Sequence, residues 1–350
     1  MLASEIIEIY SREILVREIG VKGLYKLKKT RVLVIGCGAT GSFQAELLAR
    51  LGIGFIRIVD KDFVELSNLP RTLLYNYSDS ANALPKPIAC ANRLKEIEPS
   101  IKVEPIIARV TNKNILDLMK DIDIVIDGTD NLTTRFLIND AAVKLGIPWV
   151  FVGVVSWYGN VLFINPGKGP CLRCFIPTRL LEREQRNACE VLGVVNTTVA
   201  LASTISVTLV LKHILNIDPD YSTLYLINAK EPSIMKVKIK RNSSCPTCVM
   251  RKFEFLERKA EEEKIATPIC GTRAVEIIPH ENTYIDPIKV SKNFSKEEVE
   301  AVNPYLLKIR INKDLLLIVF SDGRAIVDGT IDDKLALDLY RKYFLTKLKE

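Results

Sequence analysis

The sequence is poor in histidine, and it shows no internal repeat and no low-complexity segment. Only two histidines occur, and no motif surrounds His213 or His280. We expect His213 to lie at the end of a helix rather than to act as a catalyst. No secretory signal opens the chain, since Met1 leads directly into a charged amphipathic stretch. We therefore expect a cytoplasmic protein, in which cysteines are more often metal ligands or nucleophiles than disulfide partners.

One uncharged run is long enough to span a bilayer, from Val191 to Leu211. Its hydroxyl and amide side chains are Asn196, Thr197, Thr198, Ser203, Thr204, Ser206 and Thr208. That many polar groups favour a helix buried in a soluble core over a helix that faces lipid. We therefore expect no membrane span.

The chain has 350 residues, of which 48% are apolar and 26% are charged, as is typical of a soluble globular protein. Its length suffices for one large domain, or for a large domain with a small one. The net charge of +7 suits acidic partners such as a nucleotide phosphate or an acidic protein. Positive side chains are scattered along the chain, so we do not expect a nucleic-acid groove.

Apolar runs alternate with helical patterns over the first 155 residues. The predicted strands are Arg31–Ile35, Phe55–Val59, Lys102–Ala108, Ile122–Ile126 and Trp149–Val152, and helical patterns cover 5–29, 41–51, the stretch from Cys90 to Ile97 and Asn139–Leu145. This alternation predicts an α/β fold with a doubly wound, Rossmann-like and mostly parallel sheet. Further strands at Asn160–Asn165, Thr223–Ala229 and Ile234–Ile239 have an antiparallel pattern and extend it.

Three regions are predicted along the chain. They are a large domain over 1–249, a charged linker over 250–270 that is helical from Arg251 to Ile265, and a small α+β domain over 271–350. The small domain has predicted strands at Ala274–Ile278, Tyr305–Ile311, Leu315–Phe320 and Arg324–Val327, with a closing helix at Asp332–Phe344. Its Asp322-Gly323 pair indicates a hairpin turn.

A glycine turn follows the first predicted strand and opens a helix. It comprises residues 36–41 and includes Gly36, Gly38, Ala39 and Gly41. Glycines here let the backbone approach a phosphate, and the helix N-terminus supplies unpaired N–H groups with partial positive charge. Asp60 ends the next strand, where a carboxylate can accept ribose hydroxyls. This context predicts a nucleotide site, and taken alone it would suit a nicotinamide-dependent oxidoreductase.

Further polar side chains follow the predicted strands. They are Asp62, Asn68, Arg71, Lys86, Asp130 and Asn131. Because strand carboxyl ends in a doubly wound sheet line one crevice, these groups should converge on the glycine turn. Cations beside phosphates, with a carboxylate able to hold Mg²⁺, are typical of phosphoryl or nucleotidyl transfer. Hydride transfer needs none of them, which argues against the oxidoreductase.

The chain from about Tyr10 to Cys248 resembles the ThiF, MoeB and HesA family, which is related to the ubiquitin-activating enzymes. The matching segments are Tyr10-Ser11-Arg12, the glycine turn, Asp60-x-Asp62, Ser67-Asn68-Leu69-x-Arg71, Lys86 and Thr129-Asp130-Asn131. The resemblance implies that ATP adenylates the C-terminal glycine of a small ubiquitin-fold or sulfur-carrier protein ending in Gly-Gly.

The same resemblance implies a role for each charged group. Asp60 would hold the ribose, and Arg71 and Lys86 would bind the triphosphate and stabilise charge as pyrophosphate leaves. Asp130 would coordinate Mg²⁺. Arg12 would reach the site of a partner subunit, which implies a homodimer.

Two positions depart from the family pattern. Ala39 stands where a glycine is usual, and Thr72 stands where a glutamine is usual. Neither departure removes a charged group, so we expect activity to survive. Similar C-terminal regions occur in some prokaryotic members, but no cysteine follows Cys270, so the small domain has no visible sulfurtransferase loop.

Two Cys-x-x-Cys pairs, Cys171 with Cys174 and Cys245 with Cys248, offer the four thiolates that a closed tetrahedral zinc site needs. The pairs are far apart in the sequence, so the fold must bring them together. Unrelated or redox-active cysteines are the alternative. The resemblance favours a structural zinc, since many family members carry such pairs at both positions.

Cys189 follows a polar stretch, Pro177 to Arg186, whose three arginines would favour a thiolate. In some members of the family a cysteine here forms a thioester or acyl-disulfide with the carrier, whereas in MoeB-like members it is not needed for adenylation. A covalent role and an inert cysteine therefore both stay open. Cys37 and Cys90 fall on predicted buried faces, and we expect them to be packing residues.

Two further functions stay open. A tRNA-modifying member of the same family would activate a carboxylate on a nucleoside, which the net charge allows but the paired cysteines do not favour. A non-catalytic zinc scaffold would explain the cysteines, but not the complete set of charged groups at the strand ends.

Overall fold

The computed structural model describes residues 3–181, 192–258, 266–269, 273–279 and 284–345. The chain forms two compact units. The first comprises residues 1–77 and 85–258, and the second comprises residues 78–84 and 259–350. The second unit therefore includes a short segment from the N-terminal half of the chain, which the sequence does not indicate.

The first unit is built on an eight-stranded sheet with the strand order β3-β2-β1-β4-β5-β6-β7-β8. The strands are β1 (Arg31–Ile35), β2 (Phe55–Asp60), β3 (Lys102–Ile107), β4 (Ile124–Asp127), β5 (Trp149–Val155), β6 (Tyr158–Ile164), β7 (Thr223–Asn228) and β8 (Ser233–Lys238). Strands β1 to β5 pair in parallel, and β6, β7 and β8 continue the sheet antiparallel. The fold class predicted from the sequence is confirmed.

The order of the strands creates a switch point beside β1. The chain runs outward from β1 through β2 to β3, then returns to the other side of β1 to form β4. Residues 32–35 of β1 are all buried, as in a strand covered on both faces. The carboxyl ends of β1 and β4 therefore adjoin, and such a switch point is where doubly wound sheets bind ligands.

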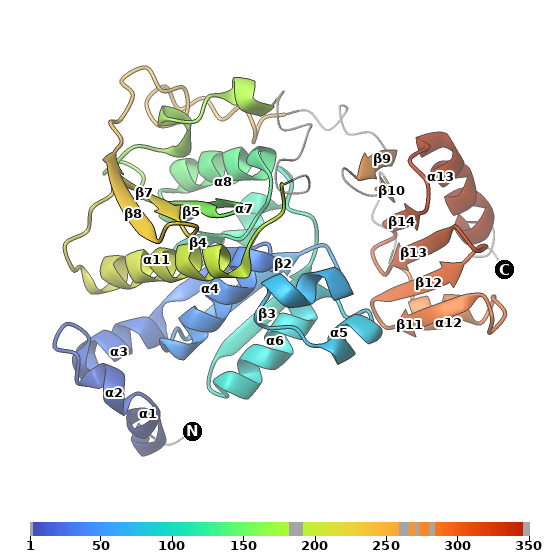
Figure 1. The fold of residues 1–350 in the computed structure, drawn as a ribbon, viewed down its shortest axis with the longest axis horizontal. Helices are drawn as coiled ribbons and strands as arrows, with labels where there is room; N and C mark the ends of the chain where they lie inside the picture. Colours follow the sequence, from blue (N-terminus) through green and yellow to red (C-terminus); the bar gives the residue numbers. More distant parts are fainter. Residues whose placement is uncertain (1–2, 182–191, 259–265, 270–272, 280–283, 346–350) are drawn as a thin grey trace. The chain divides into compact units, whose positions relative to one another are not determined.

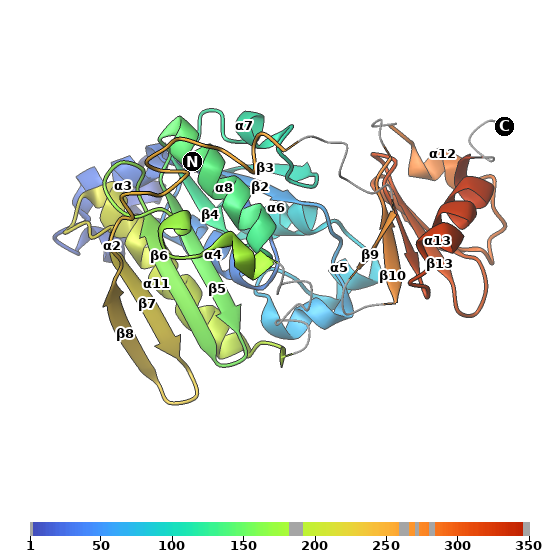
Figure 2. The same cartoon turned by 90° about the horizontal axis from the view of Figure 1, so that it is seen from above.

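Helices cover both faces of this sheet (Figures 1 and 2). On one face lie α4 (Ala39–Arg50), α6 (Lys86–Ile97) and α11 (Asn196–Leu215), with α4 in contact with both others. On the other face lie α7 (Ile115–Leu118) and α8 (Leu132–Leu145), which contact each other. Short 3-10 helices are η1 (Leu66–Arg71), η2 (Leu172–Cys174) and η3 (Thr178–Leu180).

The long uncharged segment forms α11, whose length and composition would also suit a membrane crossing. Half of its most apolar window is buried inside the protein, where α11 packs on α4 and β6. Two of its hydroxyls have buried partners: Ser206 Oγ donates to Gln44 Oε1 at 2.5 Å, and Ser203 Oγ donates to the carbonyl of Thr40 at 3.4 Å. These contacts explain how a segment with so many polar groups packs as a core helix.

The N-terminal region contains three helices, where the sequence predicts one helical stretch over 5–29. They are α1 (Ala3–Ile9), α2 (Ser11–Ile14) and α3 (Gly20–Lys29). Tyr10, between α1 and α2, is buried, and its hydroxyl donates to the carboxylate of Glu98. Lys28 forms an ion pair with the same carboxylate at 3.4 Å. Because Glu98 follows the last residue of α6, these contacts anchor the N-terminal helices at the C-terminal end of α6.

The second unit contains a six-stranded antiparallel sheet with the order β11-β12-β13-β14-β10-β9. Its elements are β9 (Ala266–Ile269), β10 (Ala274–Ile277), β11 (Val299–Asn303), β12 (Leu306–Arg310), β13 (Leu316–Phe320), β14 (Ala325–Asp328), α12 (Pro287–Ser291), α13 (Asp333–Tyr340) and a π-helical turn (Arg341–Leu345), with α5 (Tyr77–Ala81) in the early segment. Asn303 Nδ2 donates to the carbonyls of Asn82 and Ala83, at 3.0 and 3.2 Å. This contact ties segment 78–84 to the second unit.

The helix predicted from Arg251 to Ile265 is absent from the described part of that range, residues 251–258. Phe253 and Phe255 are instead buried in the core of the first unit. Phe255 stacks on Phe136, with 5.0 Å between the ring centroids. The two phenylalanines alternate with charged residues, which suits an extended segment with one buried face better than a helix.

Candidate active site and metal centre

The glycine turn packs tightly against the end of β4. Gly36 has a φ of +84°, which L side chains rarely adopt. A Cβ on Gly41 would lie 1.9 Å from the carbonyl oxygen of Gly36, and a Cβ on Gly128 would lie 2.1 Å from the same atom. A Cβ on Gly38 would meet no atom within 4 Å. Three glycines thus close the turn against β4, while Gly38 faces open space with room for a phosphate group.

Asp60, the last residue of β2, holds the glycine turn through its carboxylate. Its Oδ2 accepts a hydrogen bond from the N–H of Cys37 at 2.7 Å, and its Oδ1 accepts one from the N–H of Asp62 at 2.9 Å. Burial raises the pKa of Asp60, and the nearby ammonium of Lys86 opposes that rise. Each carboxylate oxygen has capacity for a second hydrogen bond. Asp60 can therefore fix the turn and still receive a ribose hydroxyl.

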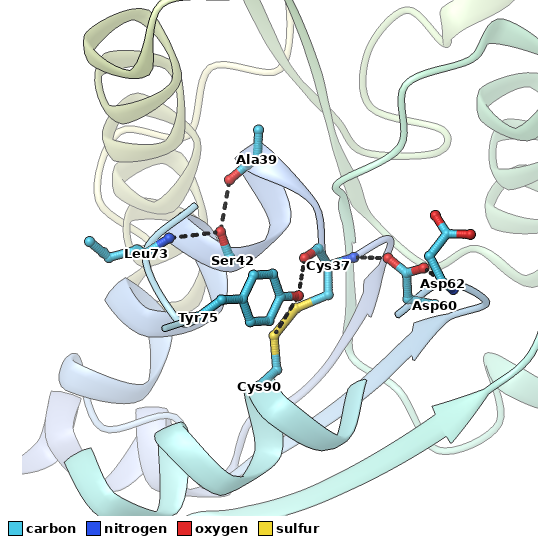
Figure 3. Close-up of a disulfide and its surroundings, with 8 residues drawn as sticks. All are labelled: Cys37, Ala39, Ser42, Asp60, Asp62, Leu73, Tyr75 and Cys90. Carbon is cyan, nitrogen blue, oxygen red and sulfur yellow. Dashed lines mark hydrogen bonds between the residues drawn. A yellow bond between two sulfur atoms is a disulfide. The ribbon is translucent and has the colours of Figure 1, made fainter. Parts of the chain in front are cut away.

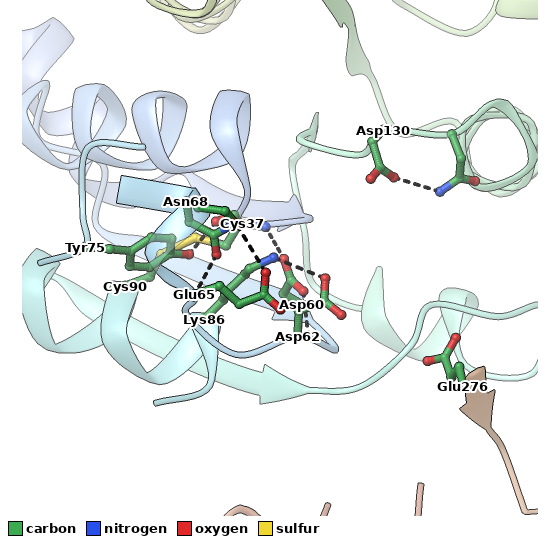
Figure 4. A network of polar contacts seen from close by, with 12 residues as sticks. Cys37, Asp60, Asp62, Glu65, Asn68, Tyr75, Lys86, Cys90, Asp130 and Glu276 are labelled. Carbon is green, nitrogen blue, oxygen red and sulfur yellow. Dashed lines mark hydrogen bonds and ion pairs between the residues drawn. A yellow bond between two sulfur atoms is a disulfide. The ribbon is translucent and has the colours of Figure 1, made fainter. Parts of the chain in front are cut away.

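Lys86 is the first residue of α6, and its side chain is only 12% exposed. Its N–H donates to the carbonyl of Asp62 at 2.8 Å, and its Nζ pairs with Asp62 Oδ2 at 3.1 Å (Figure 4). Burial disfavours the ammonium, but the carboxylates of Asp62 and Asp60 outweigh burial and raise the pKa of Lys86. Lys86 therefore stays charged at neutral pH, at the positive end of a helix, which suits an anion.

Arg71 is presented by η1, a short helix closed by a reciprocal cap. The Oδ1 of Asn68 accepts from the N–H of Glu65 at 3.1 Å, and the Glu65 side chain accepts from the backbone of Asn68. Thr72, the departure from the family pattern, donates through Oγ1 to the carbonyl of Asn68 at 2.9 Å. The Nη1 of Arg71 donates to the carbonyl of Ser67 at 2.5 Å. Asn68, which is buried, thus shapes the turn from which Arg71 projects.

A buried ion pair that local sequence patterns do not indicate lies at the end of β4. Arg135 Nε donates to Asp127 Oδ2 at 2.9 Å, and the two side chains are 11% and 0% exposed. Arg135 also donates to the carbonyls of Thr129 and Val152, at 2.6 and 2.7 Å. Asp127 accepts from the N–H and the hydroxyl of Thr129, at 2.9 and 2.6 Å. These bonds fix the turn between β4 and α8, immediately before Asp130.

Asp130 and Asn131 follow this turn. Asp130 is exposed, and its Oδ1 accepts from Asn131 Nδ2 at 3.2 Å. Asn131 caps α8, because its Oδ1 accepts from the N–H of Thr134 at 2.8 Å. Figure 4 shows Asp130 at one strand end and the pair of Asp62 and Lys86 at another. An exposed carboxylate oxygen at such an edge is a suitable ligand for a hard divalent cation.

Cys37 and Cys90, predicted to be packing residues, form a disulfide (Figure 3). Both are fully buried, so their predicted burial is right and their predicted role is wrong. The bond joins the glycine turn to α6. The hydroxyl of Tyr75 donates to the carbonyl of Cys37 and lies 3.3 Å from Cys90 Sγ.

Arg12 lies in α2 and is exposed. Two residues earlier, Tyr10 contacts Glu98 beyond the C-terminal end of α6, whereas Lys86 begins the same helix. A helix of 12 residues is about 18 Å long. Arg12 therefore lies at the opposite end of α6 from Lys86, and the structure does not bring it to the site of its own chain.

Cys189 lies outside the described residues, together with Arg183 and Arg186 of the preceding polar stretch. The described chain resumes at Leu192, and the N–H of Ser156 donates to the carbonyl of Gly193 at 2.8 Å. Ser156 follows the carboxyl end of β5. Gly193 therefore lies at the carboxyl end of β5, on the same edge of the sheet as the glycine turn.

The four predicted metal ligands lie together. The sulfur atoms of Cys171, Cys174, Cys245 and Cys248 are all within 4.8 Å of one another. The Cys171 and Cys245 sulfurs are 3.5 Å apart, and those of Cys174 and Cys248 are 3.6 Å apart. Zinc–sulfur bonds of about 2.3 Å place tetrahedral sulfurs about 3.8 Å apart. The cluster is therefore compatible with a zinc ion and needs little rearrangement to hold one.

Two neighbouring residues of α8 hold the loops that carry these cysteines. Asn139 Oδ1 accepts from the N–H of Leu172, between the first two cysteines, at 2.9 Å. Asp140 accepts from Thr247 Oγ1, between the second two, at 3.0 Å and from the N–H of Phe255 at 2.9 Å. Burial raises the pKa of Asp140 to about 6, against the effect of these hydrogen bonds. The cysteine cluster is thus attached to α8, the helix that Asn131 caps.

Comparison with known proteins is consistent with this geometry. Residues 10–247 match the ThiF family. The chain is 34% identical over 337 residues to the sulfur carrier protein ThiS adenylyltransferase of Bacillus subtilis, covering 95% of this chain and 98% of that protein. It is also 34% identical over 245 residues to a sulfur carrier protein adenylyltransferase of Thermus thermophilus, covering 68% of this chain and 89% of that protein.

The fold has solved counterparts. A crystal structure of E. coli MccB with succinimide superposes with a TM-score of 0.61 at 23% identity, covering 69% of this chain and 74% of that one. At this identity the likeness concerns the fold alone. The match over residues 10–247 and the nearly full-length relative together show that this chain belongs to the ThiF family.

Proposed function

We propose that this chain uses ATP to adenylate the C-terminal carboxylate of a small ubiquitin-fold sulfur-carrier protein. The observation that carries the proposal is a chain of contacts at the switch point of the sheet: Lys86 pairs with Asp62, Asp62 donates to Asp60, and Asp60 accepts from the N–H of Cys37 in the glycine turn. The names of the two similar proteins, both sulfur-carrier adenylyltransferases, support it. ATP–pyrophosphate exchange that depends on the carrier tests the proposal.

The chemistry requires charge stabilisation and positioning. A carboxylate oxygen of the carrier's last glycine attacks the α-phosphorus of ATP, and the bond from that phosphorus to pyrophosphate breaks. The N–H groups at the start of α4 would receive phosphate oxygens, and Asp60 would accept the ribose hydroxyls. Lys86 and Arg71 would balance the charge that develops on pyrophosphate. Asp130 would hold Mg²⁺, which neutralises phosphate charge when bound.

We further propose that the carrier ends in Gly-Gly and that Cys189 acts after adenylation. The acyl-adenylate is a strong acylating agent, so a nearby thiolate can displace AMP from it to form a thioester. The adenylation step itself uses no thiol. Cys189→Ala should therefore leave ATP–pyrophosphate exchange unchanged and remove any thiol-sensitive adduct with the carrier on a non-reducing gel. An adduct that persists in the variant would exclude Cys189 as the acceptor.

We also propose that the cysteine cluster holds one structural zinc. The four sulfur donors would fill all positions of a tetrahedral ion, which leaves none for substrate. Metal analysis should find one zinc per chain in the purified protein, and Cys248→Ser should lose it and unfold at a lower temperature. Ser244→Ala, in the same loop but outside the cluster, serves as the control and should keep the metal. Purified protein without zinc but with four reactive thiols at these positions would refute the proposal.

We also propose a homodimer in which Arg12 of each subunit completes the active site of the other. Its position at the far end of α6 supports a role in another subunit, and exposed apolar side chains on the N-terminal region, Ile7, Leu15, Val16, Val21 and Tyr25, offer a surface for that contact. Mixing Arg12→Ala subunits with Asp130→Ala subunits should restore part of the exchange activity, because one of the two composite sites then keeps both groups. Mixed dimers that form but stay inactive would contradict this arrangement.

A further inference from the structure

The disulfide between Cys37 and Cys90 connects two segments of the proposed nucleotide site. None of the roles proposed for the site residues requires a cysteine at either position. Cys37 belongs to the glycine turn, between Gly36 and Gly38, and Cys90 belongs to α6. The exposed fraction of each is 0%. Figure 3 shows the sulfur–sulfur bond between the turn and the helix, with Tyr75 alongside.

The bond completes a closed ring of contacts that includes Asp60 and Lys86 of the proposed site. Cys90 lies four residues after Lys86, so the two project from the same face of α6, one turn apart. Lys86 pairs with Asp62, the N–H of Asp62 donates to Asp60, and Asp60 accepts from the N–H of Cys37. The disulfide joins Cys37 back to Cys90. It is the covalent link that ties the helix of Lys86 to the glycine turn within this ring.

Tyr75 attaches the segment of Arg71 to the same point. Its side chain is buried, and its hydroxyl donates to the carbonyl of Cys37 beside Cys90 Sγ. Two residues earlier, the N–H of Leu73 donates to Ser42 Oγ at 3.3 Å, and that hydroxyl donates to the carbonyl of Ala39 at 3.0 Å. The three segments that carry the glycine turn, Arg71 and Lys86 therefore meet at the disulfide.

We propose that the Cys37–Cys90 disulfide is a positioning crosslink that holds the glycine turn and Lys86 at the spacing that ATP requires, an inference that rests on the proposed function. Without the bond, only hydrogen bonds and packing set that spacing. The glycine turn and Lys86 would both contact the nucleotide, and neither would bind the folded part of the carrier protein. Loss of the bond therefore weakens ATP binding and leaves carrier binding unchanged.

A crosslink that only stabilises the fold has a different signature. It acts mainly by constraining the unfolded chain, so its removal lowers the unfolding temperature. At temperatures well below unfolding, such a crosslink has no effect on the KM for ATP. A changed KM for ATP with an unchanged KM for the carrier, both measured on folded protein, therefore distinguishes positioning from simple stabilisation.

The test starts by establishing that the bond exists. Thiol titration of the denatured, zinc-free protein without reductant should leave two of the eight cysteines unreactive, and peptide mapping should identify them as Cys37 and Cys90. Eight reactive thiols would overturn the proposal at this step. Reduction of the full-length protein by a phosphine should then make the remaining two reactive.

The functional arm uses Cys90→Ala, Cys37→Ala with Cys90→Ala, and reduced wild type. The KM for ATP should rise on the order of tenfold in each, which corresponds to a loss of about 1.4 kcal/mol of binding free energy, while the KM for the carrier stays unchanged. The phosphine should not alter the double variant, which controls for effects on the other cysteines. Tyr75→Phe should shift the KM for ATP in the same direction without touching the bond. An unchanged KM for ATP in the folded variants overturns the proposal.

Direct titration with a non-hydrolysable ATP analogue separates this inference from the proposed function. Wild type that binds the analogue but shows no carrier-dependent exchange would refute the proposed function. Weaker binding of the analogue by the variants would still support the positioning role in that case. Equal binding by wild type and variants overturns the positioning role alone. Absence of nucleotide binding by wild type overturns both.

Discussion

Replacing Lys86 by alanine is expected to lower the rate of carrier-dependent ATP–pyrophosphate exchange by about 10²–10³-fold, the usual loss when one preorganised electrostatic donor is removed. The ammonium is almost buried at the start of α6 and is held by Asp62 at 3.1 Å. An ammonium has three N–H donors, and the bond to Asp62 uses one of them. The others can stabilise the charge on departing pyrophosphate, and alanine offers no replacement.

The matched control for Lys86 is Lys95→Ala, which removes an exposed lysine from the last turn of the same helix. This variant should exchange at the wild-type rate. Lys86→Ala also leaves the carboxylates of Asp60 and Asp62 without their cation, so its unfolding temperature must be measured beside its activity. Folded Lys86→Ala protein with near-wild-type exchange would show that Lys86 has no role in charge stabilisation.

Replacing Arg135 by alanine is expected to lower the free energy of unfolding by about 3–5 kcal/mol, because it leaves the buried carboxylate of Asp127 without its charged partner. Asp127 is 0% exposed, and Arg135 also bridges the carbonyls of Thr129 and Val152. Removing the guanidinium therefore leaves several buried acceptors with fewer donors. Denaturant unfolding of the two proteins measures the difference.

Arg93→Ala provides the control for Arg135, because its ion pair with Glu96 lies on the surface of α6. Such an exposed pair contributes less than about 1 kcal/mol. Arg135→Leu combined with Asp127→Leu should recover part of the lost stability, since it removes the buried charge as well as its partner. Equal unfolding midpoints for Arg135→Ala and Arg93→Ala would show that the buried pair does not stabilise the β4 turn.

The sheet of the first unit is predictable from local patterns. The glycine turn after the continuous apolar run of β1 and the polar residues after β2 and β4 mark strand ends, and parallel strands bring such ends to one edge. This reasoning places Asp60, Asp62 and Lys86 near the glycine turn. In the structure Asp60 bonds to the turn, Asp62 bonds to Asp60, and Lys86 pairs with Asp62. The spacing of the two Cys-x-x-Cys pairs separately predicts that the four cysteines share one ion, and the structure places them together.

Other features depend on contacts between distant residues. The pairing of Cys37 with Cys90 spans 53 residues, and only the packing of α6 beside the glycine turn brings the sulfurs together. The ion pair of Asp127 and Arg135 looks, in sequence, like part of a charged loop. Its burial follows from the packing of α8 against β5, which a pattern of residue types does not contain.

Predicted helices and strands were wrong or missing where charged or exposed residues alternate with the buried ones. The stretch from Arg251 to 258 reads as a charged helix, yet Phe253 and Phe255 alternate into the core. The strand β11 was missed because its sequence, Val299–Asn303, alternates exposed and half-buried positions at the edge of the second sheet, which gives a weak apolar signal.

Carrier-dependent ATP–pyrophosphate exchange by the purified full-length protein tests the central claim most directly. Radiolabelled pyrophosphate should enter ATP only when a ubiquitin-fold carrier ending in Gly-Gly is present, and a carrier lacking its last glycine should not support the exchange. Mass spectrometry of the carrier should find AMP on the C-terminal carboxylate. Exchange that is absent with every Gly-Gly carrier tested, or that proceeds equally without one, would contradict the account.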